Sequence, residues 1–209
     1  MDAKEDAKEI LIIILASIIL ALTVAFKDRA IFYAATFSFL IILTINILTK
    51  ESVGYYFETK VKTKFWSIYQ YGFRKDMHFK KPLPMLWLPL LLALFTKGFF
   101  LWLGILEFDV EAKTERVSKR HGLYRFTQVT EWHIAWIAIW AIVANLIAAI
   151  IGYVAGFELF TKLSIYFIVW STIPLPGQDG SKIFFSSRGL WAAIFIIAMI
   201  TLAWALTII

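Results

Sequence analysis

Four long apolar runs constrain the fold of this chain more than any other feature of its sequence. They cover residues 10–26, 30–48, 132–155 and 190–209. A helix needs about 20 consecutive apolar residues to cross the hydrocarbon core of a bilayer, and each run approaches that length. We therefore expect a multi-span membrane protein, in which residues 27–29 join the first two helices in a tight hairpin.

The composition agrees with a lipid environment and excludes several other classes of protein. Hydrophobic residues make up 60% of the 209 residues and charged residues only 17%, whereas a soluble domain has about 45–50% and about 25%. Disorder and nucleic-acid binding fit poorly, and the lipid bilayer is the expected partner. The absence of cysteine excludes disulfides, thiolate metal ligands and a thiol nucleophile. An acidic N-terminal stretch before the first run favours a retained span over a cleaved signal peptide.

A fifth apolar run, residues 163–173, is too short to cross a bilayer as a helix. It ends at Pro174 and Pro176, and Asp179 follows directly. A short apolar helix broken by proline beside an acid is typical of discontinuous membrane helices at functional sites. An ordinary span that ends in a polar loop explains the segment equally well, so both interpretations stay open.

A sixth apolar run, residues 84–106, is interrupted by prolines and by Thr96-Lys97-Gly98. Apolar and acidic residues then alternate strictly over residues 106–112, and this period of two predicts a half-buried strand. We expect a re-entrant hairpin that enters and leaves the membrane on one side. The predicted fold is thus an all-α multi-span membrane protein with about five transmembrane helices, plus a re-entrant hairpin with a short β element.

The distribution of lysine and arginine favours this topology. With a re-entrant hairpin, 17 of the 21 basic residues lie on one membrane face and three on the other, with Lys97 inside the hairpin. A complete crossing would reduce the bias to 11 against nine. Because basic residues accumulate on the cytoplasmic side, we expect a multi-pass plasma-membrane protein with its basic face towards the cytoplasm. Residues 50–81, which mix basic and aromatic side chains, are interpreted as an interfacial segment on anionic lipid.

Polar side chains at membrane depth are candidates for function because burying them is costly. For the two asparagines among them, hydrogen bonding between helices is the simpler interpretation. The three histidines of the chain, His78, His121 and His133, are too far apart in sequence to form a zinc-binding pair on one helix. The candidates are Asn46, Lys50, Glu51, Glu131, His133, Asn145 and Asp179.

The segment from Ser171 to Lys182, S-T-I-P-L-P-G-Q-D-G-S-K, resembles the N-x-x-P-x-x-x-x-D-G motif of the site-2 protease family, which are intramembrane zinc metalloproteases. Pro174, Asp179 and Gly180 match that motif, whereas Ser171 replaces its asparagine. In the family the aspartate is the third zinc ligand. Asn145 also matches the asparagine of the family's I-A-x-A-G-P-x-x-N-L helix.

The resemblance aligns the family's H-E-x-x-H motif with residues 50–54, K-E-S-V-G. Glu51 then stands at the general-base position, while Lys50 and Gly54 replace the two histidines. The family places a re-entrant hairpin between these motifs, as the pattern of residues 84–112 also indicates. The resemblance covers residues 30–209, so we divide the chain into an N-terminal tail with the first span, 1–29, and a site-2-protease-like membrane core, 30–209.

The missing histidines decide which function the resemblance implies. A catalytic zinc needs three protein ligands and a water molecule, and of the ligand positions only Asp179 remains. We therefore expect no cofactor, a Lys50–Asp179 ion pair in place of the metal, and a silent Glu51. The prediction is a pseudoprotease, not an enzyme, that binds or regulates the transmembrane helices of other membrane proteins. Leu106, Phe108 and Val110 would form the strand edge that binds them.

Two other functions stay open at this point. An active zinc metalloprotease would need His78, His121 or His133 as substitute ligands. A small ion or solute transporter would use Lys50, Glu51 and Asp179 as a relay.

Overall fold

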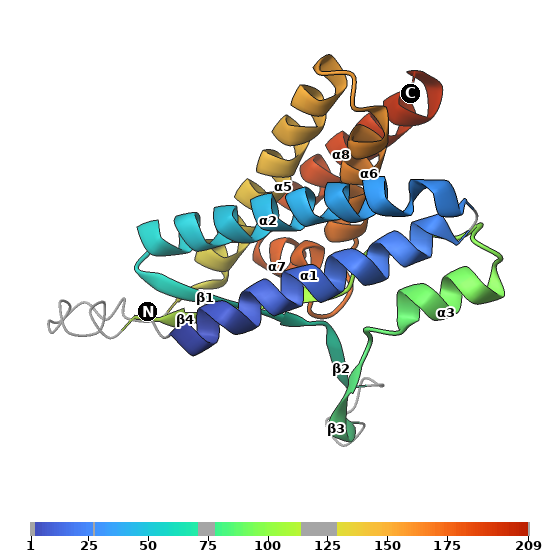
Figure 1. Cartoon of the computed structure of the whole chain (residues 1–209). Coiled ribbons are helices and arrows are strands. Elements are labelled where there is room, and N and C mark those ends of the chain that lie inside the picture. Colours follow the sequence, from blue (N-terminus) through green and yellow to red (C-terminus); the bar gives the residue numbers. More distant parts are fainter. Residues whose placement is uncertain (1–2, 27, 71–77, 114–128, 209) are drawn as a thin grey trace, which may run out of the picture.

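The computed structural model describes residues 3–26, 28–70, 78–113 and 129–208 (Figure 1). The structure is mostly helical, and all four long apolar runs form helices, as predicted. Each of these helices is long and apolar enough to cross a membrane. They are α1 (Ala3–Ala25), α2 (Phe32–Tyr56), α5 (Glu131–Val154) and α8 (Arg188–Ile208).

Helices α1 and α2 form the predicted hairpin and pack along each other. The short 3-10 helix η1 (Arg29–Ile31) joins them, and the Asp28 side chain accepts a hydrogen bond from the backbone N–H of Ala30 at its start. Leu20 of α1 and Phe39 of α2 are fully buried in the core between these helices and α6.

Helices α5 and α8 cross the α1–α2 hairpin steeply (Figure 1). Helix α6 (Glu158–Thr172) runs back from the end of α5 and packs between α5 and α8. With 15 residues, α6 is shorter than the roughly 20 residues that a complete crossing requires. The short helix α7 (Asp179–Ser186) follows and packs on α5 and α8.

The β structure is larger than the single short element that the sequence predicted. Two antiparallel two-stranded sheets pair β1 (Thr59–Phe65) with β4 (Leu106–Ala112), and β2 (Ser67–Gln70) with β3 (His78–Pro84). The bounds of β4 match the predicted strand residue for residue. The sequence T-K-V-K-T-K-F of β1 alternates in the same way, but its neighbouring aromatic residues had suggested only an interfacial segment.

The β1–β4 sheet has one apolar face and one charged face. Val61 and Phe108 are buried against α5 and α7. On the other face Lys64 pairs with Asp109 at 2.7 Å and with Glu107 at 3.1 Å. Lys62 pairs with Glu111 at 2.8 Å on the same face. Opposite charges on neighbouring strands therefore hold the register of the sheet.

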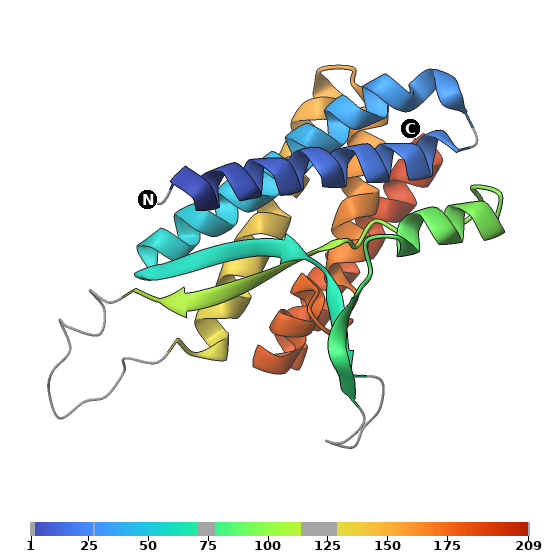
Figure 2. The same ribbon diagram turned by 60° about the horizontal axis from the view of Figure 1, so that its bottom comes forward.

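Residues 85–105 leave the β structure at the end of β3 and return to it at the start of β4 (Figure 2). The outward part contains α3 (Leu88–Phe95), which packs against α1. The chain turns at Lys97 and Gly98, where φ is 53° and 76°, and residues 99–105 return without regular structure. Phe95 and Phe99 near this turn are 80% and 89% exposed, as suits side chains that face lipid.

The sheets lie at one end of the helical assembly in both views (Figures 1 and 2). The start of α1, the end of α2, the start of α5 and all of α7 lie at this end too. The α1–α2 and α5–α6 connections lie at the opposite end. The described parts of the segments that the charge distribution assigned to one membrane face thus share one end of the molecule.

Candidate functional site

The structure brings Lys50 and Asp179 together from opposite ends of the sequence. The Nζ atom of Lys50 lies 2.9 Å from Oδ1 and 2.8 Å from Oδ2 of Asp179. Lys50 comes from the last part of α2 and Asp179 is the first residue of α7. The two residues are only 5% and 4% exposed, so the ion pair is buried. The predicted Lys50–Asp179 ion pair is confirmed.

Gly180 allows the backbone of α7 to approach the end of α6. A Cβ atom at this position would lie less than 3.0 Å from the carbonyl oxygens of Thr172 and Ile173, closer than real Cβ atoms come to other atoms. Asp179 therefore starts α7 directly beneath α6, with its carboxylate at the helix end whose dipole favours negative charge. The ion pair depends on this close approach.

The loop that leads into α7 is held by two tryptophans that the sequence did not single out. The Trp66 indole donates a hydrogen bond to the Pro176 carbonyl at 2.7 Å and stacks on Trp102 with ring centroids 5.7 Å apart. The Trp191 indole donates to the Thr172 carbonyl at 2.9 Å. Trp66 directly follows the last residue of β1. The alternating pattern of β1, had it been interpreted as a strand, would have predicted that Trp66 lies at the end of the sheet.

The residues present do not fit a zinc ion. Lys50 places an ammonium group on both oxygens of Asp179. At Gly54 a Cβ atom would lie only 2.5 Å from Cγ2 of Val61, so the β1 strand fills the space that an imidazole would need. In the described part of the chain, no group of three or more His, Asp or Glu side chains is arranged to hold a metal ion. No metal-dependent step follows from this geometry.

Phe108 lies between two lysines at the centre of the site. Its ring centroid is 4.5 Å from Nζ of Lys50 and 3.4 Å from Nζ of Lys182, which also donates a hydrogen bond to the Phe108 carbonyl. Burial lowers the pKa of Lys182 to about 8, and the positive charge of Lys50 acts in the same direction. The carboxylates of Asp179, Asp109 and Glu107 oppose this shift.

Other charged groups, on β1, α6 and α8, contact different residues. On β1, the hydrogen bond to Asp109 raises the pKa of Lys64. Arg188 of α8 lies over the Phe184 ring, 5.7 Å away. Glu158 and Lys162 lie at the start of α6, whereas its far end contacts α7.

The outer edge of β4 carries the backbone groups of the three predicted edge residues, Leu106, Phe108 and Val110. The backbone N–H of Thr63, which is paired with Phe108, points away from β4 and donates to Oε1 of Glu9 at 3.3 Å. In an antiparallel ladder, the backbone groups of such a pair both face outward. The same geometry recurs every second residue, so all three edge residues share this orientation.

The remaining predicted polar residues lie outside the ion pair. Glu51 is partly buried on α2 beside Lys50. His133 contacts Thr130 Oγ1 at 2.6 Å through Nδ1, and its ring packs edge-on against Phe57 at 5.1 Å. Phe57 is seven residues beyond Lys50, which is about 10 Å along a helix. Glu131 is exposed at the start of α5, and the His78 side chain and His121 lie outside the described residues.

The two buried asparagines differ from the expectation of interhelical hydrogen bonds. Both side-chain amide atoms of the fully buried Asn145 lack a hydrogen-bond partner among the described residues, as does Nδ2 of Asn46. Ser164 instead donates to the backbone carbonyl of Asn145 at 3.1 Å. The bond between the two helices is thus made by the Ser164 hydroxyl and the main chain of α5. The prediction considered only the side-chain amide of Asn145, so it did not include this bond.

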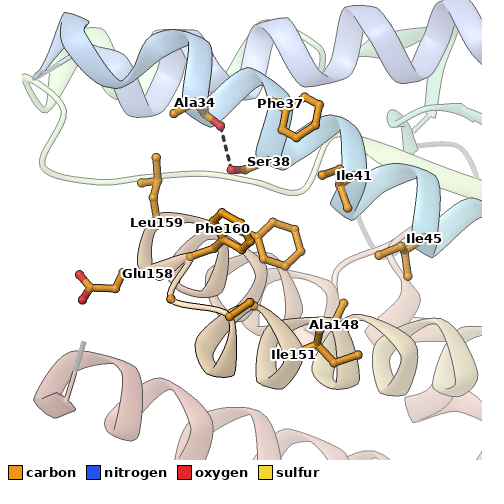
Figure 3. A pocket seen from close by; sticks show the side chains of 14 residues that line it. Ala34, Phe37, Ser38, Ile41, Ile45, Ala148, Ile151, Glu158, Leu159 and Phe160 are labelled. Atoms are coloured by element: carbon orange, nitrogen blue, oxygen red, sulfur yellow. Dashed lines mark hydrogen bonds between the residues drawn. The ribbon is translucent and has the colours of Figure 1, made fainter.

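An apolar groove of about 610 Å³ lies between α2, α5 and the start of α6 (Figure 3). Phe37, Ile41 and Ile45 line it from α2, and Phe160 from α6. Ser38, the polar side chain that α2 contributes, already donates to the Ala34 carbonyl at 2.8 Å. The groove belongs to the first half of α2, so it is separate from the Lys50–Asp179 site.

The geometry of the site suits binding better than activation of water. Its carboxylate is neutralised by an ammonium group, and a strand edge lies directly beside the pair. The sequence matches no protein-family model, and it matches no curated protein and no solved structure.

Proposed function

We propose that this chain is a catalytically silent, site-2-protease-like membrane protein that binds extended segments of other membrane proteins. The observation that carries the proposal is the buried ion pair between Lys50 and Asp179. The resemblance gives these two positions to zinc ligands. The direct bond between them supports the proposal that the Lys50 ammonium group takes the place that the zinc ion has in the family.

The electrostatics of the site support the absence of catalysis. A zinc ion at Asp179 would have to displace the Lys50 ammonium and leave it buried without its partner. Breaking a buried ion pair in this way costs about 3–5 kcal/mol. Without a metal-bound water, Glu51 has no activated nucleophile to deprotonate.

The proposed membrane topology has five helices and a re-entrant hairpin. Helices α1, α2, α5 and α8 cross the bilayer, and α6 is a discontinuous fifth helix that ends at Thr172, just before Pro174. Residues 85–105 enter and leave on one side. The return of this segment to β4 supports the hairpin. Among the described residues, most lysines and arginines lie at the end of the molecule with the sheets, so we infer that this end faces the cytoplasm from the plasma membrane.

The outer edge of β4 is the proposed binding surface. An exposed strand edge binds extended peptides by adding a strand, since it offers unpaired backbone groups. The edge residues are Leu106, Phe108 and Val110. A transmembrane helix from a partner protein would unwind locally to reach them.

Photocrosslinking tests the binding proposal. The protein in nanodiscs, with benzoylphenylalanine at Val110, would be mixed with a synthetic 20-residue apolar peptide carrying Asn-Pro at its centre. We expect peptide adducts at Val110 and few at Lys60, the control on β1, which lies on the opposite side of β4 from the proposed edge. Lipid adducts alone at both positions would contradict the proposal.

Elemental analysis tests the proposed loss of catalysis. We expect purified protein to contain far less than one zinc per chain. Stoichiometric zinc, together with a peptide-cleaving activity that Glu51→Gln abolishes, would instead establish an active protease.

A further inference from the structure

The proposed binding edge is already occupied at its central residue. The Phe108 carbonyl faces outward from β4, and the Lys182 ammonium donates a hydrogen bond to it. The same Nζ atom lies 3.4 Å from the centroid of the Phe108 ring. Lys182 therefore contacts both the main chain and the side chain of Phe108. Phe108 is also the central residue with which an added strand would pair.

The short helix α7 takes part in both lysine contacts of the site, through Asp179 and through Lys182. Asp179 and Lys182 are three residues apart and so project from the same side of the helix. Asp179 binds Lys50 of α2, and Lys182 binds Phe108 of β4. The Ser181 hydroxyl donates to the Gln178 carbonyl at 2.8 Å and fixes the start of the helix. The ion pair thus holds Lys182 in place against the strand.

We propose that Lys182 is a built-in competitor for the β4 edge, which an incoming extended segment must displace from the Phe108 carbonyl. The inference rests on the proposed function, because it describes how the same edge is regulated. A backbone N–H of the incoming segment would take over the acceptor that Lys182 now uses. The resting protein is therefore closed, and only segments that also bind the neighbouring positions of β4 open it.

Three substitutions test the competition. Lys182→Met removes the donor but keeps an unbranched side chain, Lys182→Arg keeps a charged donor, and Lys182→Gln is a neutral donor in case the methionine variant does not fold. Lys162→Met on α6 is the matched control, since it removes a lysine near the opposite end of the molecule. Binding of the fluorescent form of the Asn-Pro peptide to each variant in nanodiscs would be measured by anisotropy.

We expect Lys182→Met to bind the peptide about tenfold more tightly than the unaltered protein, because a hydrogen bond from a charged donor no longer has to be broken. Lys182→Gln should show a smaller gain, while Lys182→Arg and Lys162→Met should show none. Amide hydrogen exchange at Phe108 and Val110 should also accelerate in Lys182→Met without peptide.

Two different failures are distinguishable. Equal peptide affinity in all folded variants, with crosslinks at Val110, would overturn the competition and leave the binding function intact. Absence of peptide binding in every variant would overturn the binding function itself, and the competition with it.

Discussion

Lys50 and Asp179 each depend on the other because both are removed from water. An isolated charge in such surroundings is strongly disfavoured, whereas a paired one is tolerated. The short distances to both carboxylate oxygens show that the ammonium group is shared between them. The pair therefore fixes the position of α7 relative to α2.

Single substitutions in this pair should destabilise the fold more than their combination. We expect Lys50→Met or Asp179→Leu alone to lower the free energy of unfolding by about 3–5 kcal/mol, since each leaves an unpaired buried charge. The double variant should recover much of this loss. Denaturation in mixed micelles, followed by tryptophan fluorescence, gives the coupling energy. Strictly additive effects would show that the pair does not act as a unit.

The close approach at Gly180 leads to a second prediction about one residue. Gly180→Ala should lower the free energy of unfolding by about 1–3 kcal/mol, because the added methyl group overlaps the end of α6. Gly189→Ala is the control, since a Cβ atom there meets nothing within 4 Å. If both variants unfold at the same denaturant concentration as the unaltered protein, α6 and α7 do not pack this tightly.

The lowered pKa of Lys182 gives stability a specific dependence on pH. Between about pH 8 and pH 10.5 the unfolded chain keeps the proton on this lysine, whereas the folded chain releases it. The free energy of unfolding should therefore rise with pH across this interval, and the Lys182 contribution should be flat below it. Lys182→Met should lack this rise. The raised pKa of Lys64 acts in the opposite direction only above pH 10.5. A rise of equal size in both proteins would assign the effect to another group.

At the scale of single elements, sequence patterns predicted the helices and strands whose pattern lies within one segment. The long apolar runs identified four helices, and the alternation over residues 106–112 identified β4, because each pattern lies within one segment. The strand β1 has the same alternation, yet its partner strand lies far along the chain: Thr59 is paired with Ala112, 53 residues away. Nothing within a seven-residue window identifies that partner.

The hairpin of residues 85–105 can be tested with cysteine labelling, which is clean because the chain has no cysteine of its own. We expect Lys62→Cys and Asp109→Cys to react with an impermeant maleimide from the same membrane face, since the two positions are paired across the sheet. Lys97→Cys at the turn should be protected from that face. Reaction of positions 62 and 109 from opposite faces would mean that the segment crosses the bilayer.

The site shows where prediction from the sequence stops. The resemblance to site-2 proteases led to Lys50 and Asp179, since it ties distant motifs to one centre. The contact between Lys182 and Phe108 and the bond from Trp66 to Pro176 were not predicted. Each joins a side chain to a main-chain carbonyl on a distant segment, and no spacing of residue types encodes such a bond.

At the scale of the whole molecule, the sheets and most of the basic residues that the structure describes share one end. We expect Arg188→Cys to react with the impermeant maleimide from the same face as Lys62→Cys. Asp28→Cys and Lys162→Cys should react from the other face, because the α1–α2 and α5–α6 connections lie at the opposite end. All four positions reacting from one face would contradict the proposed membrane arrangement.

The contact between Gly54 and Val61 limits which substitutions this chain can accept during evolution. Histidine at position 50 alone would remove the cation that balances Asp179, and histidine at position 54 alone would overlap β1. A three-ligand metal centre at these positions would therefore need at least three substitutions, at Lys50, Gly54 and Val61. The first steps weaken the fold before any metal can compensate. The packing of Val61 on Gly54 thus opposes the evolution of a metal-binding centre at this site.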